Sequence, residues 1–329
     1  MLFTSVNETV ATTLKNYSGL LTDNITTNQV VLWWLGKLGG IETRNGGLCI
    51  AESIIGEDNA SVQSYSGADP LNTTASEAAT QAEYEWKQVA GVTQITGLQQ
   101  FQNSAGPTQI VNLWNGKMMQ LATTMRRRVN TMLYSDGSGN NNKDIMGALA
   151  AIENGDNWST YGQIDSNANT WWRNVFVDAP NYTASTNFLD GVRSLVVKCT
   201  AGPDAPHLIT TTQLLYLYFL SLLEQKEQFI RVDGDEEMAR AGFKHFTYMG
   251  IPVVWDEDML PNTTGDDAQG MVAWNLNYAK FVIGEGRDFA FTDPVTPDDQ
   301  DLESVKCLLI ANLALTNRRR QGRADFATT

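Results

Sequence analysis

The sequence predicts an α+β protein in which part of the chain extends beyond a packed body. A long amphipathic pattern runs from about Pro107 to Tyr134, and strands alternate with helices from about residue 180 onward. Between Asn45 and Trp86, in contrast, the chain carries seven carboxylates and no Lys or Arg. This acidic segment has too few apolar residues to form a core alone, because each ordered residue costs backbone entropy. It is either a disordered insertion or an arm that leans on another subunit, and the rest of the chain favours the arm.

Composition limits the class of protein. The 329 residues are 42% hydrophobic and include nine tryptophans, which is enough for a sizeable core. A net charge of −14 argues against a surface that grips nucleic acid, since phosphate binding needs many cations. Three widely spaced cysteines indicate a reducing compartment. The start lacks a signal-peptide pattern and the most apolar run, Leu214 to Leu223, is too short to span a bilayer, so we expect a soluble, cytoplasmically made protein without a membrane partner.

The N-terminal third predicts an arm followed by a hairpin. Residues 1–45 are expected to form the arm, with the pair Trp33-Trp34 as one apolar anchor. The stretches 48–55 and 83–98 are strand-like and enclose a turn-rich tip at Gly67–Pro70. Such a long hairpin is marginal alone. Its carboxylates have no basic partner between Asn45 and Trp86, so they are candidates for contact with another part of the chain or another subunit: Glu52, Glu57, Asp58, Asp69, Glu77, Glu83 and Glu85.

The amphipathic helix is the clearest element. Pro107 suits the first helical position. The apolar stripe has an eleven-residue repeat and consists of Ile110, Trp114, Met118, Leu121, Met125, Val129 and Met132. A stripe that stays straight over roughly 40 Å suits packing along a sheet better than a two-stranded coiled coil. Arg126 and Arg127 are expected to point away from the stripe and Arg128 to flank it. These arginines meet phosphate, meet the acidic hairpin of a neighbour, or lie on a solvated helix face.

The rest of the chain predicts mixed secondary structure. The turn at Tyr134–Gly139 leads into a Gly/Asn/Trp-rich stretch that ends in Trp171-Trp172-Arg173-Asn174. Helices are predicted over 186–198 and 212–228, and strands over 207–210, 243–248, 251–255, 271–275, 280–284 and 304–316. Three arginines follow the last strand. Arg318, Arg319 and Arg320 are expected to cap a sheet edge or to face a neighbouring subunit.

No pattern in the sequence predicts catalysis or cofactor binding. The two histidines, His207 and His245, lie in apparent strands without a Gly-x-Ser-x-Gly elbow nearby. No Cys or His pair has the spacing of zinc ligands, and no glycine-rich phosphate loop lies between a strand and a helix. We therefore expect no enzymatic activity, no cofactor and no resident metal.

The order of these features resembles the major capsid proteins of tailed bacteriophages. The resemblance covers residues 50–323 and rests on short pieces in a fixed order. They are Tyr65-Ser-Gly67-Ala-Asp69-Pro70-Leu71, Glu83-Tyr84-Glu85-Trp86-Lys87-Gln88, Ile95-Thr96-Gly97-Leu98, Gln102-Asn103-Ser104-Ala105-Gly106 with the helix, Tyr134–Gly139, Trp171–Asn174, Gly250-Ile251-Pro252-Val253-Val254, Asp258-Met259-Leu260-Pro261 and Asn317-Arg-Arg-Arg-Gln-Gly-Arg323. Each piece is weak alone, and their number and order make the match specific.

The resemblance implies an N-terminal arm (1–45), an extended hairpin called the E-loop (46–100), a peripheral domain with a long spine helix (101–178 and 286–329) and an axial domain (179–285). It also implies hexamers and pentamers that close into an icosahedral shell around double-stranded DNA. Implied partners are a separate scaffolding protein, a portal and a decoration protein. The implied location is the virion capsid, assembled in the host bacterial cytoplasm. The acidic balance agrees, because a cationic wall would bind the packaged genome.

Two other functions stay open at this point. An encapsulin-type nanocompartment has the same shell fold but encloses enzymes. A hydrolase or sugar-binding β protein is suggested only by the Trp/Asn/Gly-rich region 154–174.

Overall fold

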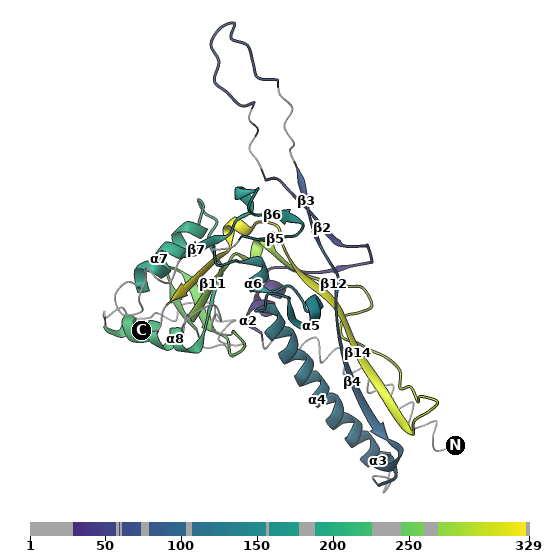
Figure 1. Ribbon diagram of the computed structural model, residues 1–329. Coiled ribbons are helices and arrows are strands. Elements are labelled where there is room, and N and C mark those ends of the chain that lie inside the picture. Colours follow the sequence, from purple (N-terminus) through teal and green to yellow (C-terminus); the bar gives the residue numbers. More distant parts are fainter. Residues whose placement is uncertain are drawn as a thin grey trace.

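The computed structural model describes residues 29–56, 59, 61–73, 79–102, 107–155, 158–177, 188–225, 245–259 and 269–326. Figure 1 shows a body with two sheets, a long helix on one side and a hairpin that projects far from it. Predicted contacts of Glu57, Asp58 and Glu77 fall outside the described residues.

The first sheet is organised around one long strand, β14 (Leu302–Leu315). Its first part pairs antiparallel with β4 (Lys87–Thr96), and its last part pairs antiparallel with β12 (Ala279–Gly284). Two short strands complete this sheet, β1 (Ile41–Arg44) beside β12 and β13 (Ala290–Phe291) beside β14. Burial alternates from Val305 to Ala311, as the sequence predicts for a strand with one covered face, and every residue from Ala311 to Leu315 is buried. β14 therefore links distant parts of the chain.

Helix α4 (Pro107–Leu133) confirms the predicted long helix. Its stripe is buried from Trp114 to Met132, and the side chain of Ile110 lies outside the described residues. Trp114 and Met118 pack with Ile95 and Val305 of the first sheet. A Cβ built on Gly91 of β4 would lie 2.5 Å from Cδ1 of Leu121, so the helix approaches the strand closely at that point. The straight stripe thus packs along a sheet, as the eleven-residue repeat predicts.

The second sheet has the order β7-β15-β11-β8-β10-β9. Its strands are β7 (Val175–Val177), β8 (Leu208–Thr211), β9 (His245–Tyr248), β10 (Ile251–Trp255), β11 (Gln269–Trp274) and β15 (Gly322–Phe326). Helices α7 (Phe188–Cys199) and α8 (Gln213–Gln225) pack against it around Phe188 and Phe219. These elements agree with the predicted helices and strands to within a few residues.

The two sheets do not follow the domain boundaries predicted from the sequence at 179 and 285. β7 and β15 lie outside that range but belong to the second sheet, while β12 lies inside the range but pairs in the first sheet. A strand belongs to the sheet in which it pairs, whatever its position along the chain. β15, for example, pairs with both β11 and β7, which lie far from it in the sequence. The hydrophobic pattern of a single strand does not show which sheet that strand joins.

The later part of the predicted arm is folded into the body. Helix α2 (Val30–Lys37) buries Val30, Val31, Leu32, Trp34 and Leu35 in the main core, and β1 pairs in parallel with β12. Trp33 and Trp34 are in edge-to-face contact at 5.5 Å. The expected apolar anchor is present, whereas residues 1–28 lie outside the described part of the chain.

The predicted strand 83–98 is two strands. β3 (Thr80–Tyr84) pairs with β2 (Ile50–Ile54), and the chain then changes partner so that β4 pairs with β14. Two side chains hold the break: Asn312 Nδ2 donates to the Glu85 carbonyl at 2.8 Å, and Trp86 Nε1 donates to the Gly47 carbonyl at 3.0 Å.

Short elements fill the remaining connections. They are α3 (Gly97–Gln102), α5 (Gly139–Asn142), α6 (Ala148–Ala151), β5 (Thr160–Tyr161), β6 (Ile164–Asp165) and the 3₁₀ turns η1 (Thr170–Trp172), η3 (Leu276–Tyr278) and η4 (Arg318–Arg320).

Candidate functional site

The projecting hairpin is the feature that most distinguishes this molecule from a closed globular body (Figure 1). β2 and β3 pair from Ile50 with Tyr84 to Ile54 with Thr80, and beyond them the chain runs out to the tip and back. Large apolar side chains on this segment face solvent, Ile55 at 82% and Val62 at 83% exposure, together with Tyr65 and Leu71. These four side chains lie on the projecting segment and are not covered by the subunit's own body.

The root of the hairpin, by contrast, is charged and paired within its own subunit. Glu52 lies 93% buried between Arg44 and Lys280, and its Oε2 is 3.3 Å from Nζ of Lys280. Lys280 also meets Glu42 at 2.9 Å. The hydrogen bond from Lys280 lowers the pKa of Glu42. Burial alone would lower the pKa of Lys280, but Glu42 and Glu52 outweigh burial and raise it.

For two of the candidate carboxylates, the partner comes from another part of the same chain, which is one of the two alternatives that the sequence left open. Glu52 is buried against Arg44 and Lys280 and is closed to a neighbour's arginines, whereas Glu85 contacts Lys87 at 3.0 Å but keeps 67% of its side chain exposed. Asp69 accepts from the backbone N–H of Ser66 at 2.9 Å and is exposed at the tip. Glu83 is exposed on β3. Among the described carboxylates of the hairpin, Asp69, Glu83 and Glu85 keep the accessibility that an intersubunit contact needs.

The arginines of α4 lie on its outer surface, as predicted. Arg128 pairs with Asp144 at 2.7 Å, and Arg127 approaches Asp258 at 3.9 Å. Both side chains are substantially exposed, 49% and 75% respectively, so these pairs are screened and contribute little to stability. Arg126 is half-buried, and its carbonyl accepts a hydrogen bond from Nε2 of Gln29 at 2.6 Å. Local carboxylates thus already face two of the three arginines.

The arginines after β14 take three different positions. Arg318 is fully buried and lies 3.1 Å from Glu153, while Arg319 is exposed and Arg320 is 3.8 Å from Asp204. The prediction that Arg318 faces a neighbour is therefore wrong, because no surface of it is accessible. A 3₁₀ turn rotates successive side chains by about 120°, which places Arg318 inside and Arg319 outside.

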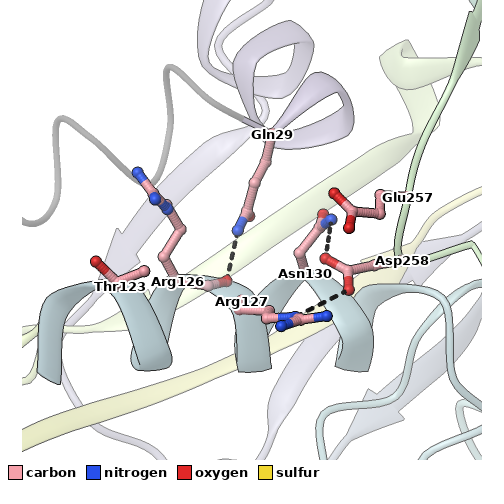
Figure 2. A pocket seen from close by; sticks show the side chains of 7 residues that line it. All are labelled: Gln29, Thr123, Arg126, Arg127, Asn130, Glu257 and Asp258. Carbon is pink, nitrogen blue, oxygen red and sulfur yellow. Dashed lines mark hydrogen bonds and ion pairs between the residues drawn. The ribbon is translucent and has the colours of Figure 1, made fainter. Parts of the chain in front are cut away.

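A polar hollow of about 300 Å³ lies beside α4. Figure 2 shows its lining: Gln29, Thr123, Arg126, Arg127, Asn130, Glu257 and Asp258. Two arginines and two carboxylates balance one another, and the Thr123 hydroxyl donates to the Met119 carbonyl of its own helix. The lining contains no paired nucleophile and base. The hollow lies between the residue before α2, the C-terminal half of α4 and the loop after β10.

Buried hydrogen bonds fix the end of α4 against the second sheet. Asn130 Nδ2 donates to Asp256 at 2.9 Å and to Asp258 at 2.8 Å, and the Tyr134 hydroxyl donates to Asp256 at 3.0 Å. Burial raises the pKa of Asp256, and the donors from Asn130 and Tyr134 oppose that effect. These contacts set the position of the helix relative to β10.

The histidines occupy separate places in the second sheet. His207 precedes β8, and burial lowers its pKa while Asp204 opposes the shift. His245 is buried at the start of β9. Within the described ranges, no group of three or more His, Cys, Asp or Glu side chains could hold a metal ion. In the same part of the chain, no helix combines the length and apolar character needed to cross a membrane.

The tryptophans that suggested sugar binding are used inside the fold. Trp172 is buried and its Nε1 donates to the Tyr161 carbonyl at 2.9 Å. Trp171 packs against Gly56 of the hairpin. Trp158 stacks on the guanidinium of Arg173 at 5.2 Å. Sequence reasoning missed these hairpin contacts, because nothing in the local pattern connects Trp171 with Gly56.

Comparison with known proteins identifies the fold. No protein-family model matches the sequence, and no curated protein matches it. Solved structures match over most of their length. The capsid of cyanophage A-1(L) is 14% identical with a TM-score of 0.65, covering 88% of this chain and 90% of that one. The capsid of Myoviridae phage XM1 is 10% identical with a TM-score of 0.58, covering 89% and 91%.

A cellular shell protein also matches. The encapsulin complex of Synechococcus elongatus is 13% identical with a TM-score of 0.55, and the match covers 89% of this chain and 86% of that one. At these identities the likeness establishes the fold alone. The chain therefore has the shell fold of tailed-phage major capsid proteins, which the matched encapsulin shares.

Proposed function

We propose that this protein is the major capsid protein of a tailed bacteriophage, a structural subunit without catalytic activity. It assembles as hexamers and pentamers into an icosahedral shell that encloses double-stranded DNA. The observation that carries this proposal is the projecting hairpin, whose apolar side chains Ile55, Val62, Tyr65 and Leu71 are exposed on a single subunit. Burial of such surface between chains stabilises association by about 25 cal/mol per Å² of apolar area before the costs of association.

Assembly assigns roles to the remaining parts. The hairpin serves as the E-loop and lies across the neighbouring subunit, α4 serves as the spine helix, and the second sheet with α7 and α8 surrounds the capsomer axis. Asp69, Glu83 and Glu85 are the exposed hairpin carboxylates that can meet a neighbour's cations, and Arg127 and Arg319 are exposed members of the two arginine clusters. Each exposed pair would contribute only about 0–1 kcal/mol, so apolar contact dominates the interface.

The acidic balance supports DNA as the content. With a net charge of −14, the shell wall does not bind the DNA phosphates tightly, so the genome is enclosed but not bound. The further partners in this proposal are a separate scaffolding protein, a portal and a decoration protein. The proposed location is the virion capsid, after assembly in the host bacterial cytoplasm.

A nanocompartment shell is the second candidate, because an encapsulin is among the structural neighbours. The two functions differ in what the particle holds. Purified particles treated with nuclease outside and then opened would release protected DNA from a phage shell and a cargo protein from a nanocompartment.

The experiment that tests the proposal is electron microscopy of the purified protein, alone and with the phage scaffolding protein. We expect closed icosahedral particles. A second sample with residues 59–79 replaced by a short Gly/Ser linker should keep the helical content of the wild type but form no closed shells. The proposal fails if the wild type stays monomeric under all assembly conditions, or if the shortened protein forms normal particles.

A further inference from the structure

The Gly/Asn/Trp-rich segment touches the root of the hairpin at a backbone hydrogen bond and an aromatic contact. The Glu83 N–H of β3 donates to the Gly162 carbonyl at 3.0 Å. Next to it, the rings of Tyr84 and Tyr161 are 5.2 Å apart. Gly162 has φ +60°, and a Cβ there would lie 3.0 Å from the Tyr84 hydroxyl and 3.1 Å from Cβ of Ala82. A glycine is therefore required for this close approach.

A third contact lies where β2 ends and the projecting part begins. A Cβ built on Gly56 would lie 2.4 Å from the nearest ring carbon of Trp171, so the indole presses directly on the hairpin backbone. Trp171 is itself held by Trp172, whose ring is 5.8 Å away, 61° from parallel. Trp172 is 1% exposed. The buried ring of Trp172 thus supports the Trp171 indole from the side of the subunit's body.

The opposite strand of the root is anchored to the first sheet. The Tyr84 hydroxyl donates to the Leu315 carbonyl of β14 at 2.6 Å. Glu52 of β2 is held between Arg44 and Lys280. Both strands of the root are therefore fixed to the body of the same subunit, and the chain beyond Gly56 extends from a fixed point.

We propose that residues 160–172, here called the root clamp, set the direction of the hairpin in the free subunit before assembly. This inference rests on the proposed shell function, which gives the direction its importance. The eleven residues that follow Gly56, up to Gly67 at the tip, would span roughly 35 Å when extended. A 10° rotation at the root therefore displaces the tip by about 6 Å, more than the spacing of about 4.8 Å between neighbouring strands. A small change in the position of the Trp171 ring would thus decide whether the hairpin tip reaches its contact site on the neighbouring subunit.

The experiment measures hydrogen exchange of the unassembled subunit. Trp171→Ala should accelerate exchange of the β2 and β3 amides by about tenfold or more, since local opening controls their protection, and should leave α4 amides unchanged. Trp158→Ala is the matched control, because Trp158 lies in the same segment but stacks on Arg173. It should change exchange of the root less than about twofold. Protection of α4 shows in each case that the variant is folded.

Gly56→Ala provides an independent variant of the same contact. Alone it should accelerate exchange at the root, because the new Cβ collides with the indole. In the Trp171→Ala background the same substitution should have little further effect, because the collision partner is gone. Unchanged root exchange in Trp171→Ala, or full additivity of the two substitutions, would overturn the proposal. These measurements use the free subunit, so failure of the wild type to form shells would count against the shell function and leave the clamp standing.

Discussion

Arg318 makes the most sharply testable contribution to stability. Its Nε donates to the Ala151 carbonyl at 2.7 Å, one guanidinium nitrogen donates to Ser166 Oγ at 2.6 Å, and the other lies 3.1 Å from Glu153. The rings of Tyr161 and Trp172 lie 5.0 Å and 5.9 Å from the guanidinium carbon. Burial lowers the pKa of Arg318, and Glu153 opposes the shift. The arginine therefore ties the segment after β14 to the loops around Glu153 and Ser166.

Replacing Arg318 with Met keeps much of the side-chain volume but leaves Glu153 buried without its cation. Breaking a buried pair in this way costs about 3–5 kcal/mol, which is a large share of the 5–15 kcal/mol that stabilises a typical domain. The two lost hydrogen bonds are part of the same figure and do not add to it. We expect the free energy of unfolding to fall by that amount.

The assay is urea unfolding of unassembled subunits, followed by tryptophan fluorescence and by far-ultraviolet circular dichroism. Arg319→Met is the matched control: its side chain is exposed one residue away, so its effect should stay within about 0.5 kcal/mol. The double variant Glu153→Gln with Arg318→Met should recover part of the loss, since no charge is then buried alone. If Arg318→Met unfolds within 1 kcal/mol of the wild type, roughly the effect of an exposed site, the assigned role is wrong.

Three further predictions concern α4, its contact with β10, and the histidines. Leu121→Asp places a charge between α4 and the first sheet, so it should lower the free energy of unfolding in chemical denaturation by several kcal/mol. Gln120→Asp, on the exposed face of the helix, should not. A stable, shell-forming Leu121→Asp protein would refute this packing. The raised pKa of Asp256 means that the folded state binds the extra proton more tightly, so this group favours folding below its unfolded pKa of about 3.8 and loses that contribution as pH rises through its folded value. Asp256→Asn should therefore reduce the fall in stability with rising pH in that window, and an unchanged pH profile would contradict the shift. The double variant His207→Gln, His245→Gln should assemble as the wild type does in electron micrographs, and a clean loss of a measured turnover in that folded variant would overturn the proposed structural role.

Periodic elements could be predicted from the sequence because their signal is local. The stripe from Trp114 to Met132 defines α4, and the alternation from Val305 to Leu315 defines β14, since burial of one face imposes the period of each element. The hairpin could be predicted from its acidic composition and its turn residues. Its projection away from the body agrees with the lack of apolar residues for a core of its own.

Pairings between distant residues could not be predicted in the same way. Glu52 is neutralised by Lys280, 228 residues farther along the chain, and no local pattern contains that information. The burial of Arg318 was hidden because three consecutive arginines are typical of an exposed surface, and only the 3₁₀ turn separates their environments. The contact of Trp171 with Gly56 depends on shape, which composition does not encode. The residues that sequence reasoning missed are therefore those whose contacts join parts of the chain that are distant in the sequence.

The bond from Tyr84 to the Leu315 carbonyl also orders events in time, because its two residues are 231 positions apart. At a synthesis rate of about 5–20 residues per second, Tyr84 leaves the ribosome roughly 10 to 50 seconds before its partner does. During that interval β4 has no β14 to pair with, and the hairpin strands have no finished body to rest on. A nascent chain consequently cannot hold its hairpin as the finished subunit does. On the proposed shell function, only chains synthesised through β14 can join a growing particle, so translation itself would exclude incomplete subunits.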